Sequence, residues 1–491
     1  MERPDYTLEA ARQYEREQLA SIPQQERPLF HLTPAVGWMN DPNGFCYYND
    51  AWHLFYQYYP YDRVWGPMHW GHAVSKDLLH WQHLPAALAP DSDADYKGCY
   101  SGSALPLENG QLMMMYTGVT TDETGAESQT QCIAVSSGNE FCKDAANPVI
   151  GAAALPEGFS TRDFRDPKIW QQDGRFYCVA VGRHAARQGS VLLYESDDAV
   201  HWNCLGVPAA SDGKWGEMWE CPDLFLLEDR PVLLLSTIDM QPEAIGEFRQ
   251  GRNTLAMLGE PAGSPLHFTL QQAQTLDQGL EFYAPQTTLA PDGRRILVGW
   301  MENWDTVDSE ERTDAWFSRM SLPRELMLKN GRLCQQPVRE LERLHRNTVQ
   351  YTGWKLDGER PLPGVEGQRL DLTVTLQLPS GAACRRFRLQ FAADKLHYTE
   401  LCYTPHTGEL VLDRSRSGSK RAGAHRCSLT TAARNDLLEL RLILDKGSVE
   451  VFVNGGERVM SAVLPAFEQA DGITFAAEGP LTLDVTAHQL A

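Results

Sequence analysis

The sequence predicts an all-β protein in which a five-bladed β-propeller is followed by a C-terminal β-sandwich. Two observations lead to this prediction. Turn-type residue pairs, each followed by an apolar run, recur about every 60 residues through the first two thirds of the chain. From about residue 352 onward, apolar and polar residues instead alternate in short segments, as they do in the strands of a sandwich.

The first segment, residues 1–27, is predicted to be a helical extension. Its sequence, MERPDYTLEAARQYEREQ at the start, is charged and contains no apolar stretch, so no signal peptide is visible. No run in the chain approaches the ~18 apolar residues that a membrane span needs. We therefore expect a cytoplasmic protein without a membrane partner.

Residues 28–328 are predicted to form the propeller. Each unit contains an apolar or alternating run, a tight turn and a second apolar run. The turn pairs are Asn49-Asp50, Asn109-Gly110, Asp173-Gly174, Glu228-Asp229 and Asp292-Gly293. In a propeller the first strand of each blade lines the central channel. Residues at equivalent positions of these strands should therefore meet in one funnel: Asp41, Ser101, Asp166, Glu220 and Tyr283.

Outer strands leave a repeated signal as well. Residues 75–81, SKDLLHW, and residues 195–202, ESDDAVHW, share the pattern Ser-x-Asp-x-x-His-Trp, and residues 134–141 are a looser copy. This repetition adds further strands to each unit and favours blades of four strands.

The remainder of the chain divides into a connection and a second domain. Residues 329–350 carry charged and apolar positions at helical spacing, which predicts a short linker. Residues 351–491 alternate with period two and predict the β-sandwich. No acidic cluster occurs in this second domain, so we expect it to support the propeller or to form a homodimer contact rather than to bind sugar.

Three acidic motifs begin separate propeller units: WMNDPNG, FRDP and WECPD. They place Asp41, Asp166 and Glu220 at matched positions just ahead of apolar runs. A single Asp-Pro pair usually marks only a turn, because Asp side chains bond to nearby backbone. Three carboxylates at matched positions, flanked by tryptophans and Arg165, instead predict a shared acidic pocket.

Composition narrows the class of ligand. The formal net charge of -21 disfavours nucleic acid, which requires a basic surface. Eleven cysteines without a C-x-x-C pair indicate neither a disulfide framework nor a zinc site. Thirteen tryptophans are more informative, since flat rings stack on sugar rings. We assign Trp38, Trp65 and Trp300 to the pocket because each adjoins a funnel motif or a strand end.

The carboxylates match glycoside hydrolysis best, because the chain has no metal-ligand spacing, Gly-rich phosphate loop or Ser-His-Asp arrangement. One carboxyl must protonate the leaving oxygen while another stays ionised. Glu220, between Trp219 and Cys221, lies in an apolar setting that favours the protonated acid. We expect hydrogen-bond donors to keep Asp41 ionised and Arg165 to favour the charged form of Asp166.

A family resemblance now becomes apparent. The motifs WMNDPNG, FYQYYP, VWGPMHWGHAVSKDLLHW, YSGSA, FRDPKIW, WECPDLF, FYAPQ, VGWM and SLPREL occur in the order typical of glycoside hydrolase family 32. The chain resembles these invertases, sucrose-6-phosphate hydrolases and fructan hydrolases from about Pro28 to its end. The resemblance implies a retaining mechanism on β-fructofuranosides, in which Asp41 is the nucleophile, Glu220 the acid and base, and Asp166 a transition-state stabiliser. It implies no cofactor and no metal.

The resemblance also implies a fructose pocket completed by Asn40, Gln57, Trp65, Ser101 and Arg165. Glu281 stands where the family commonly has Asp before FYA, and with Tyr283 it is expected to contact substrate. The leading hypothesis is a β-fructofuranosidase acting on sucrose or short fructo-oligosaccharides. The alternatives are a sucrose-6-phosphate hydrolase, for which Arg63, Lys97, Arg183 and His184 offer basic groups, a fructosyltransferase, and a sugar-binding propeller without turnover.

Overall fold

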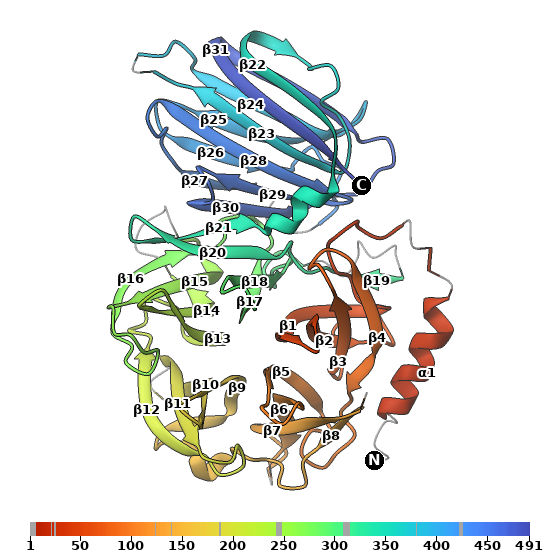
Figure 1. The fold of residues 1–491 in the computed structure, drawn as a ribbon, viewed down its shortest axis with the longest axis vertical. Helices are drawn as coiled ribbons and strands as arrows, with labels where there is room; N and C mark the ends of the chain where they lie inside the picture. The colour runs from red at the N-terminus through yellow and green to blue at the C-terminus, as the bar shows by residue number, and fades with distance from the viewer. Residues whose placement is uncertain are drawn as a thin grey trace.

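A computed structural model shows five blades arranged around a central axis, with a second β-domain attached to one side (Figure 1). The structure describes residues 6–20, 22, 23, 26–122, 124–138, 140–185, 188–241, 248–307, 315–379, 381–421 and 426–491. The predicted all-β class, with a five-bladed propeller and a sandwich, is confirmed. None of the helices in these ranges is long and apolar enough to cross a membrane.

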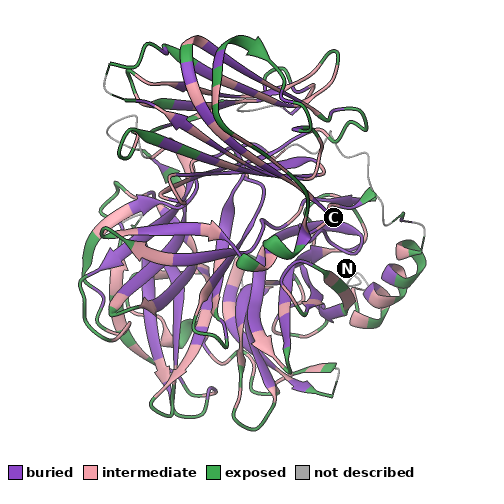
Figure 2. Ribbon diagram, turned by 45° about the horizontal axis from the view of Figure 1, so that its top comes forward, coloured by how far each residue is buried: buried purple, intermediate pink, exposed green. Residues whose placement is uncertain are grey.

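Each blade is an antiparallel sheet whose first strand lies nearest the centre (Figure 1). The first four blades are β1 (Gly37–Tyr48), β2 (Ala51–Tyr59), β3 (His69–Ser75) and β4 (Trp81–Leu88); β5 (Gly98–Pro106), β6 (Leu112–Thr121), β7 (Glu127–Ser137) and β8 (Glu140–Lys143); β9 (Phe159–Gln172), β10 (Arg175–His184), β11 (Gln188–Ser196) and β12 (Asn203–Ala210); and β13 (Met218–Leu227), β14 (Arg230–Met240), β15 (Gly251–Gly259) and β16 (Leu270–Thr275). Figure 2 shows the strands around the propeller axis as mostly buried and the outer loops as exposed.

The predicted turn pairs join the first two strands of every blade. Asn49 and Asp50 both have positive φ, at 49° and 57°, as a two-residue type I′ hairpin requires. Asp173 and Gly174 repeat this geometry in the third blade. The outer-strand motif is equally regular, because Asp77 accepts hydrogen bonds from the backbone of the turn that follows β3, as Asp198 does after β11.

The fifth blade corrects the predicted domain boundary. It contains β17 (Tyr283–Leu289), β18 (Arg295–Trp300), β20 (Arg324–Lys329) and β21 (Arg332–Pro337), so the propeller continues to Pro337 rather than to residue 328. The predicted linker at 329–350 is therefore mostly ordered structure: the end of this blade, the 3-10 helix η3 (Arg339–Leu344) and the start of the sandwich. The helical spacing predicted for this segment belongs to η3, in which Leu341 and Leu344 are buried.

The short strand β19 (Trp316–Phe317), which lies between β18 and β20 in sequence, pairs in parallel with β1, so that the last blade is joined to the first. This pairing closes the ring, because Gly37 lies opposite Trp316 and Trp38 opposite Phe317. A closed ring brings residues about 180 positions apart, such as Asp41 and Cys221, into one funnel.

The C-terminal domain is one continuous sheet folded into two layers over an apolar core. Its strands are β22 (His345–Arg360), β23 (Leu370–Gln377), β24 (Arg386–Ala393), β25 (Thr399–Thr404), β26 (Glu409–Asp413), β27 (Arg426–Thr430), β28 (Leu437–Asp445), β29 (Ser448–Val453), β30 (Arg458–Val463) and β31 (Gly472–Leu490). The long β31 links the layers, since its first part pairs with β24 and its second with β23.

The N-terminal segment contains α1 (Leu8–Leu19), which lies along the outside of the first blade (Figure 1). Thr7 caps the helix by accepting a hydrogen bond from the backbone N–H of Ala10. Arg12 donates to the carbonyl of Ala86, and Glu15 accepts from the N–H of the same residue. The helix thereby satisfies backbone groups of β4 that would otherwise form an open sheet edge.

A buried ionic network joins the propeller to the sandwich. The ring of His31 contacts Asp445 at 2.9 Å through Nδ1 and Glu450 at 3.0 Å through Nε2, with all three side chains fully buried. Glu450 also accepts hydrogen bonds from Arg324. Burial opposes the imidazolium charge, but the two carboxylates outweigh it and raise the pKa of His31 above its usual value. The interface therefore favours the protonated form of a histidine that lies between two acids.

We expect His31→Gln to lower the free energy of unfolding by about 3–5 kcal/mol, because it removes the cation that lies between two buried carboxylates. The folded-state pKa of His31 lies above the unfolded value of 6.5. Its contribution is thus complete below about pH 6.5 and disappears as pH rises through the folded value. Thermal melts of both proteins from pH 5 to 9 should show a difference that shrinks at high pH. The exposed His80–Asp77 pair supplies the control, and His80→Gln should change little.

Candidate active site

The three predicted carboxylates meet at the centre of the propeller, on the first strands of blades 1, 3 and 4. Asp41 accepts hydrogen bonds from Asn40 Nδ2 at 3.0 Å and Ser101 Oγ at 2.7 Å. Cys221 connects this group to Asp166, because its Sγ lies 3.4 Å from Asp41 Oδ2 and 3.7 Å from Asp166 Oδ2. Residues from β1, β5, β9 and β13 therefore share one cluster.

Local backbone geometry turns these side chains inward. Each innermost strand has an interrupted register at the predicted funnel position: between Met39 and Pro42, Tyr100 and Gly102, Arg165 and Lys168, Glu220 and Asp223, and Tyr283 and Gln286. Asp166 itself has a φ of 61° and Cys221 a φ of 49°. Such bulges bend a strand and redirect its side chains, and they are frequent beside active sites. Five equivalent bulges explain why five polar residues point to one place.

Glu220 is held by two donors. Arg165 Nη2 lies 3.0 Å from Glu220 Oε1, and the Tyr283 hydroxyl donates to Oε2 at 2.6 Å. The side chain of Glu220 is nevertheless 20% exposed, compared with 6% for Asp166. The carboxyl of Glu220 is thus both oriented and accessible from the funnel, as a proton donor must be.

The pKa values of the other two acids shift in the direction opposite to the prediction. Burial, followed by the charge of Glu220, raises the pKa of Asp41 despite the donors Asn40 and Ser101. Burial likewise raises the pKa of Asp166 to about 7, although Arg165 acts in the opposite direction. The expectation that local donors keep Asp41 ionised underestimated burial and the neighbouring carboxylates, which the linear sequence does not reveal.

The predicted effect of Arg165 on Asp166 is present, but Arg165 also has a second and nearer partner. Although adjacent to Asp166 in sequence, its guanidinium lies closer to Glu220, at 3.0 Å, than to Asp166, at 3.8 Å. Neighbours along a bulged strand point in different directions, so Arg165 turns across to the next blade. It therefore stabilises an anion on Glu220 more directly than one on Asp166.

Aromatic rings form one wall beside Asp41. Trp38 stacks on Phe317 at 5.0 Å and on Trp304 at 5.8 Å between ring centroids, and its Nε1 donates to Asn40 Oδ1. Trp300, which is buried, packs behind this group at 4.9 Å from Trp304. Trp38 and Trp300 thus act mainly by packing, whereas Trp65 is 46% exposed and lies edge-on to Tyr100.

Two predicted substrate contacts have other partners here. Gln57 is buried and donates to the carbonyl of Cys99, which places it against the neighbouring blade. Glu281 is 0% exposed and forms an ion pair with Arg414 of the sandwich at 2.7 Å. Its assignment to the sugar pocket is therefore corrected, since the Glu281 side chain turns to the interface while Tyr283, two residues later, turns to the funnel.

Three site residues escaped the sequence reasoning. Cys221 lies inside the motif WECPD but was treated as a small apolar neighbour, although its backbone N–H donates to Asp166 Oδ2 at 2.9 Å. Thr117 Oγ1 accepts from the N–H of Asp166, and Gln129 Oε1 accepts from Arg165 at 3.4 Å. Thr117 and Gln129 come from second and third strands of blade 2, whose alternating pattern carries no distinguishing signal.

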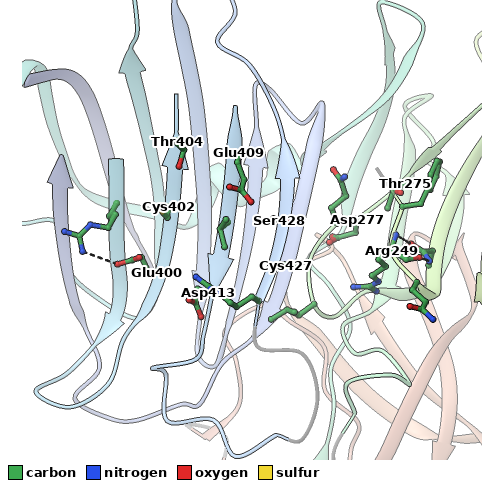
Figure 3. Close-up of a pocket in the computed structure, with 18 of the residues that line it drawn as sticks. Arg249, Thr275, Asp277, Glu400, Cys402, Thr404, Glu409, Asp413, Cys427 and Ser428 are labelled. Carbon is green, nitrogen blue, oxygen red and sulfur yellow. Dashed lines mark hydrogen bonds and ion pairs between the residues drawn. The ribbon is translucent and has the colours of Figure 1, made fainter. Parts of the chain in front are cut away.

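A separate cleft of about 1000 Å³ lies between blade 4 and the sandwich (Figure 3). In Figure 3, Arg249, Thr275 and Asp277 face sandwich residues such as Glu400 across it. The three carboxylates lie elsewhere, and charged groups of the cleft pair with one another, as Arg426 does with Asp413 at 2.8 Å. Its chemistry is that of a solvated domain boundary. Within the described ranges, no cluster of three or more His, Cys, Asp or Glu side chains could hold a metal ion.

Comparisons with known proteins agree with this geometry. Residues 31–337 match the glycosyl hydrolases family 32 N-terminal domain, and residues 340–489 match the family's C-terminal domain. The chain is 37% identical over 462 residues to a raffinose invertase of Escherichia coli and 36% identical to a sucrose-6-phosphate hydrolase of the same organism, each covering 93% of both chains.

Solved structures give the same result. A Bombyx mori GH32 β-fructofuranosidase is 34% identical, with a TM-score of 0.83 and coverage of 98% of this chain and 97% of that one. A sucrose-6-phosphate hydrolase from Lactobacillus gasseri is 28% identical, with a TM-score of 0.85 and 99% coverage of both chains. A mutant of the Bombyx mori enzyme has been solved in complex with sucrose.

Proposed function

Because this chain belongs to glycosyl hydrolase family 32 and is a glycoside hydrolase, we propose that its funnel hydrolyses terminal β-D-fructofuranosides, such as sucrose and short fructo-oligosaccharides, with retention of configuration. The observation that supports this most is the cluster of Asp41, Asp166 and Glu220 around Cys221. It supplies one carboxyl group for each role in a double displacement.

In the first step, Asp41 attacks C2 of the fructosyl unit while the bond from C2 to the leaving oxygen breaks. Ser101 and Asn40 orient the attacking carboxylate. Glu220 transfers its proton to the leaving oxygen, so a neutral sugar departs and a fructosyl ester remains on Asp41. Asp166 binds fructose hydroxyls and stabilises the positive charge that develops at the ring.

In the second step, Glu220 acts as a base. It takes a proton from water, the water oxygen attacks C2, and the ester bond to Asp41 breaks, which restores both carboxyls. Arg165 and the Tyr283 hydroxyl remain hydrogen-bonded to the Glu220 anion in the interval between the two steps. The same two contacts thus hold the group that must change protonation state twice.

Sucrose-6-phosphate is the second candidate substrate, and Arg183 is the residue that favours it. Its side chain is 37% exposed on blade 3 and pairs with Asp163 at 2.6 Å, while Asp163 also contacts Arg165 at 3.6 Å. Through Asp163 this guanidinium is linked to Arg165, the partner of Glu220, and its charge suits a phosphate on the leaving glucose. Other basic groups that the sequence offers for a phosphate are Lys97, Arg63 and His184.

Initial rates on sucrose, sucrose-6-phosphate and a short β-2,1 fructan at matched concentrations distinguish these substrates. NMR during the first minutes should detect β-fructofuranose before mutarotation, as retention requires. Initial release of the α anomer would contradict the double displacement.

If Arg183 binds phosphate, Arg183→Ala should lower kcat/KM for sucrose-6-phosphate by about tenfold and leave kcat/KM for sucrose unaffected. Equal loss on both substrates would exclude that role.

A further inference from the structure

A loop of the sandwich, residues 414–421, brings two arginines to blade 5. Their partners are Glu281, just before β17, and Glu302, just after β18. Arg414 is fully buried, and its Nη1 donates to Glu281 Oε2 at 2.9 Å while Nη2 lies 2.7 Å from Oε1. Arg421 pairs in the same two-point manner with Glu302, which is also buried. The two hydrogen bonds between Arg421 and Glu302 fix direction as well as distance. Both carboxylates belong to the propeller and both guanidiniums to the sandwich.

The Arg414 pair leads to the proposed acid. The segment before Glu281 is docked on β30, where Leu280 N–H donates to the carbonyl of Ser461 at 2.8 Å. Glu281 itself accepts from Val463 N–H at 2.9 Å. Two residues after this anchored position, the hydroxyl of Tyr283 donates to Glu220. The position of Tyr283, and with it the orientation of the Glu220 carboxyl, thus depends on a contact with the other domain.

The Arg421 pair leads to the proposed nucleophile. Two residues after Glu302, the ring of Trp304 stacks on Trp38 with an interplanar angle of 26°. Trp38 Nε1 donates to Asn40 Oδ1 at 2.7 Å, and Asn40 Nδ2 donates to Asp41. Trp304 therefore packs on Trp38, and the hydrogen bond from Trp38 orients Asn40, which donates to Asp41. The position of this aromatic wall again depends on an arginine of the sandwich.

We propose that Arg414 and Arg421 are positioning residues of the active site, Arg414 acting on Glu220 through Glu281 and Tyr283, and Arg421 acting on Asp41 through Glu302, Trp304 and Trp38. The sandwich, joined to blade 5 along β30 and β21 (Figure 1), is then a working part of catalysis rather than only a support. The inference rests on the catalytic roles proposed above. It also accounts for the burial of Glu281. The Glu281 carboxylate holds the backbone segment that carries Tyr283, and Tyr283 contacts Glu220.

The roles proposed for Arg414 and Arg421 predict different kinetic effects. An aryl β-D-fructofuranoside with a nitrophenolate leaving group needs little protonation, whereas sucrose needs the acid. Arg414→Met should therefore lower kcat/KM for sucrose by about ten- to a hundredfold and affect the aryl substrate much less. Arg421→Met should lower kcat/KM for both substrates by similar factors, and near-UV circular dichroism should change because the tryptophan stack moves.

Each single variant removes the nearest cation of a buried carboxylate, although Arg421 also lies 3.7 Å from Glu281 Oε1. The neutralised pairs Arg414→Met with Glu281→Gln and Arg421→Met with Glu302→Gln are therefore measured alongside. Arg414→Lys keeps the charge without the bidentate geometry and should give an intermediate value. Arg441→Met breaks a bidentate pair with Asp371 inside the sandwich and should leave both rates unchanged.

Glu220→Gln separates failure of this inference from failure of the proposed function. If Glu220→Gln discriminates between sucrose and the aryl substrate while folded Arg414 variants do not, the positioning role of Arg414 is refuted. If folded Arg421 variants keep wild-type rates on both substrates, the role of Arg421 is refuted as well. If Glu220→Gln itself affects both substrates equally, the assignment of Glu220 as the acid fails, and with it the basis of the role proposed for Arg414.

Discussion

Asp41→Asn is expected to lower kcat on sucrose by about four to six orders of magnitude, because removal of an attacking group typically costs that much. The amide of Asn keeps the shape of the carboxylate and can still bond to Ser101 and Asn40, but it cannot form the fructosyl ester. Stopped assays with long incubation, which measure very slow release of fructose, would provide the rate.

The same substitution should not destabilise the protein. Burial raises the pKa of Asp41, so its ionised form is less favourable in the folded than in the unfolded chain. Above the unfolded pKa the neutral Asn avoids this cost, and Tm at pH 7 should equal or exceed that of the wild type. Asp50→Asn, in the exposed hairpin of the same blade, is the matched control and should be fully active. A well-folded Asp41→Asn protein with substantial turnover would refute the nucleophile assignment.

Glu220→Gln is expected to lower kcat/KM for sucrose by about 10²- to 10⁴-fold, the usual contribution of a general acid. For a nitrophenyl β-D-fructofuranoside the decrease in kcat/KM should be far smaller, because nitrophenolate leaves without a proton. The second step should become rate-limiting on that substrate, since no base activates water. A burst of nitrophenolate followed by slow turnover would show this directly.

Azide provides an independent measurement on the same variant. It attacks the fructosyl intermediate without needing a base, so it should accelerate the slow phase of Glu220→Gln and yield a fructosyl azide. Glu195→Gln, which breaks an exposed ion pair with Arg175 at 3.0 Å, serves as the control and should behave like the wild type. An absence of both the burst and the azide effect would contradict the role of Glu220 as acid and base.

Sequence periodicity predicted the propeller because a repeated strand, turn and strand has to bury its apolar faces against its neighbours. The hairpins at Asn49-Asp50 and Asp173-Gly174 are local features, in which side-chain type alone selects a positive φ. The boundary was misplaced at residue 328, because the helical spacing that belongs to η3 was extended back over β21.

The candidate site was likewise predictable from the sequence only in part. Asp41, Asp166 and Glu220 were found from the sequence, because their equivalent positions in repeated units send them to one funnel, and the structure shows them together around Cys221. Their charge relationships were not predictable. Arg165 turns from its sequence neighbour Asp166 to Glu220, a choice that depends on the bulge in β9 and on the adjacent blade.

Local residue preferences and the repeat thus established the fold class, the turns and the three acids, since each depends on interactions within about ten residues or on a fixed period. Long-range packing determined which groups meet across blades and across the domain boundary. Glu281 shows the difference most clearly: its place in the sequence indicated a sugar contact, yet its carboxylate pairs with Arg414, 133 positions away. Burial makes such pairing obligatory, because an unpaired charge in the interior costs more than the chain can sustain.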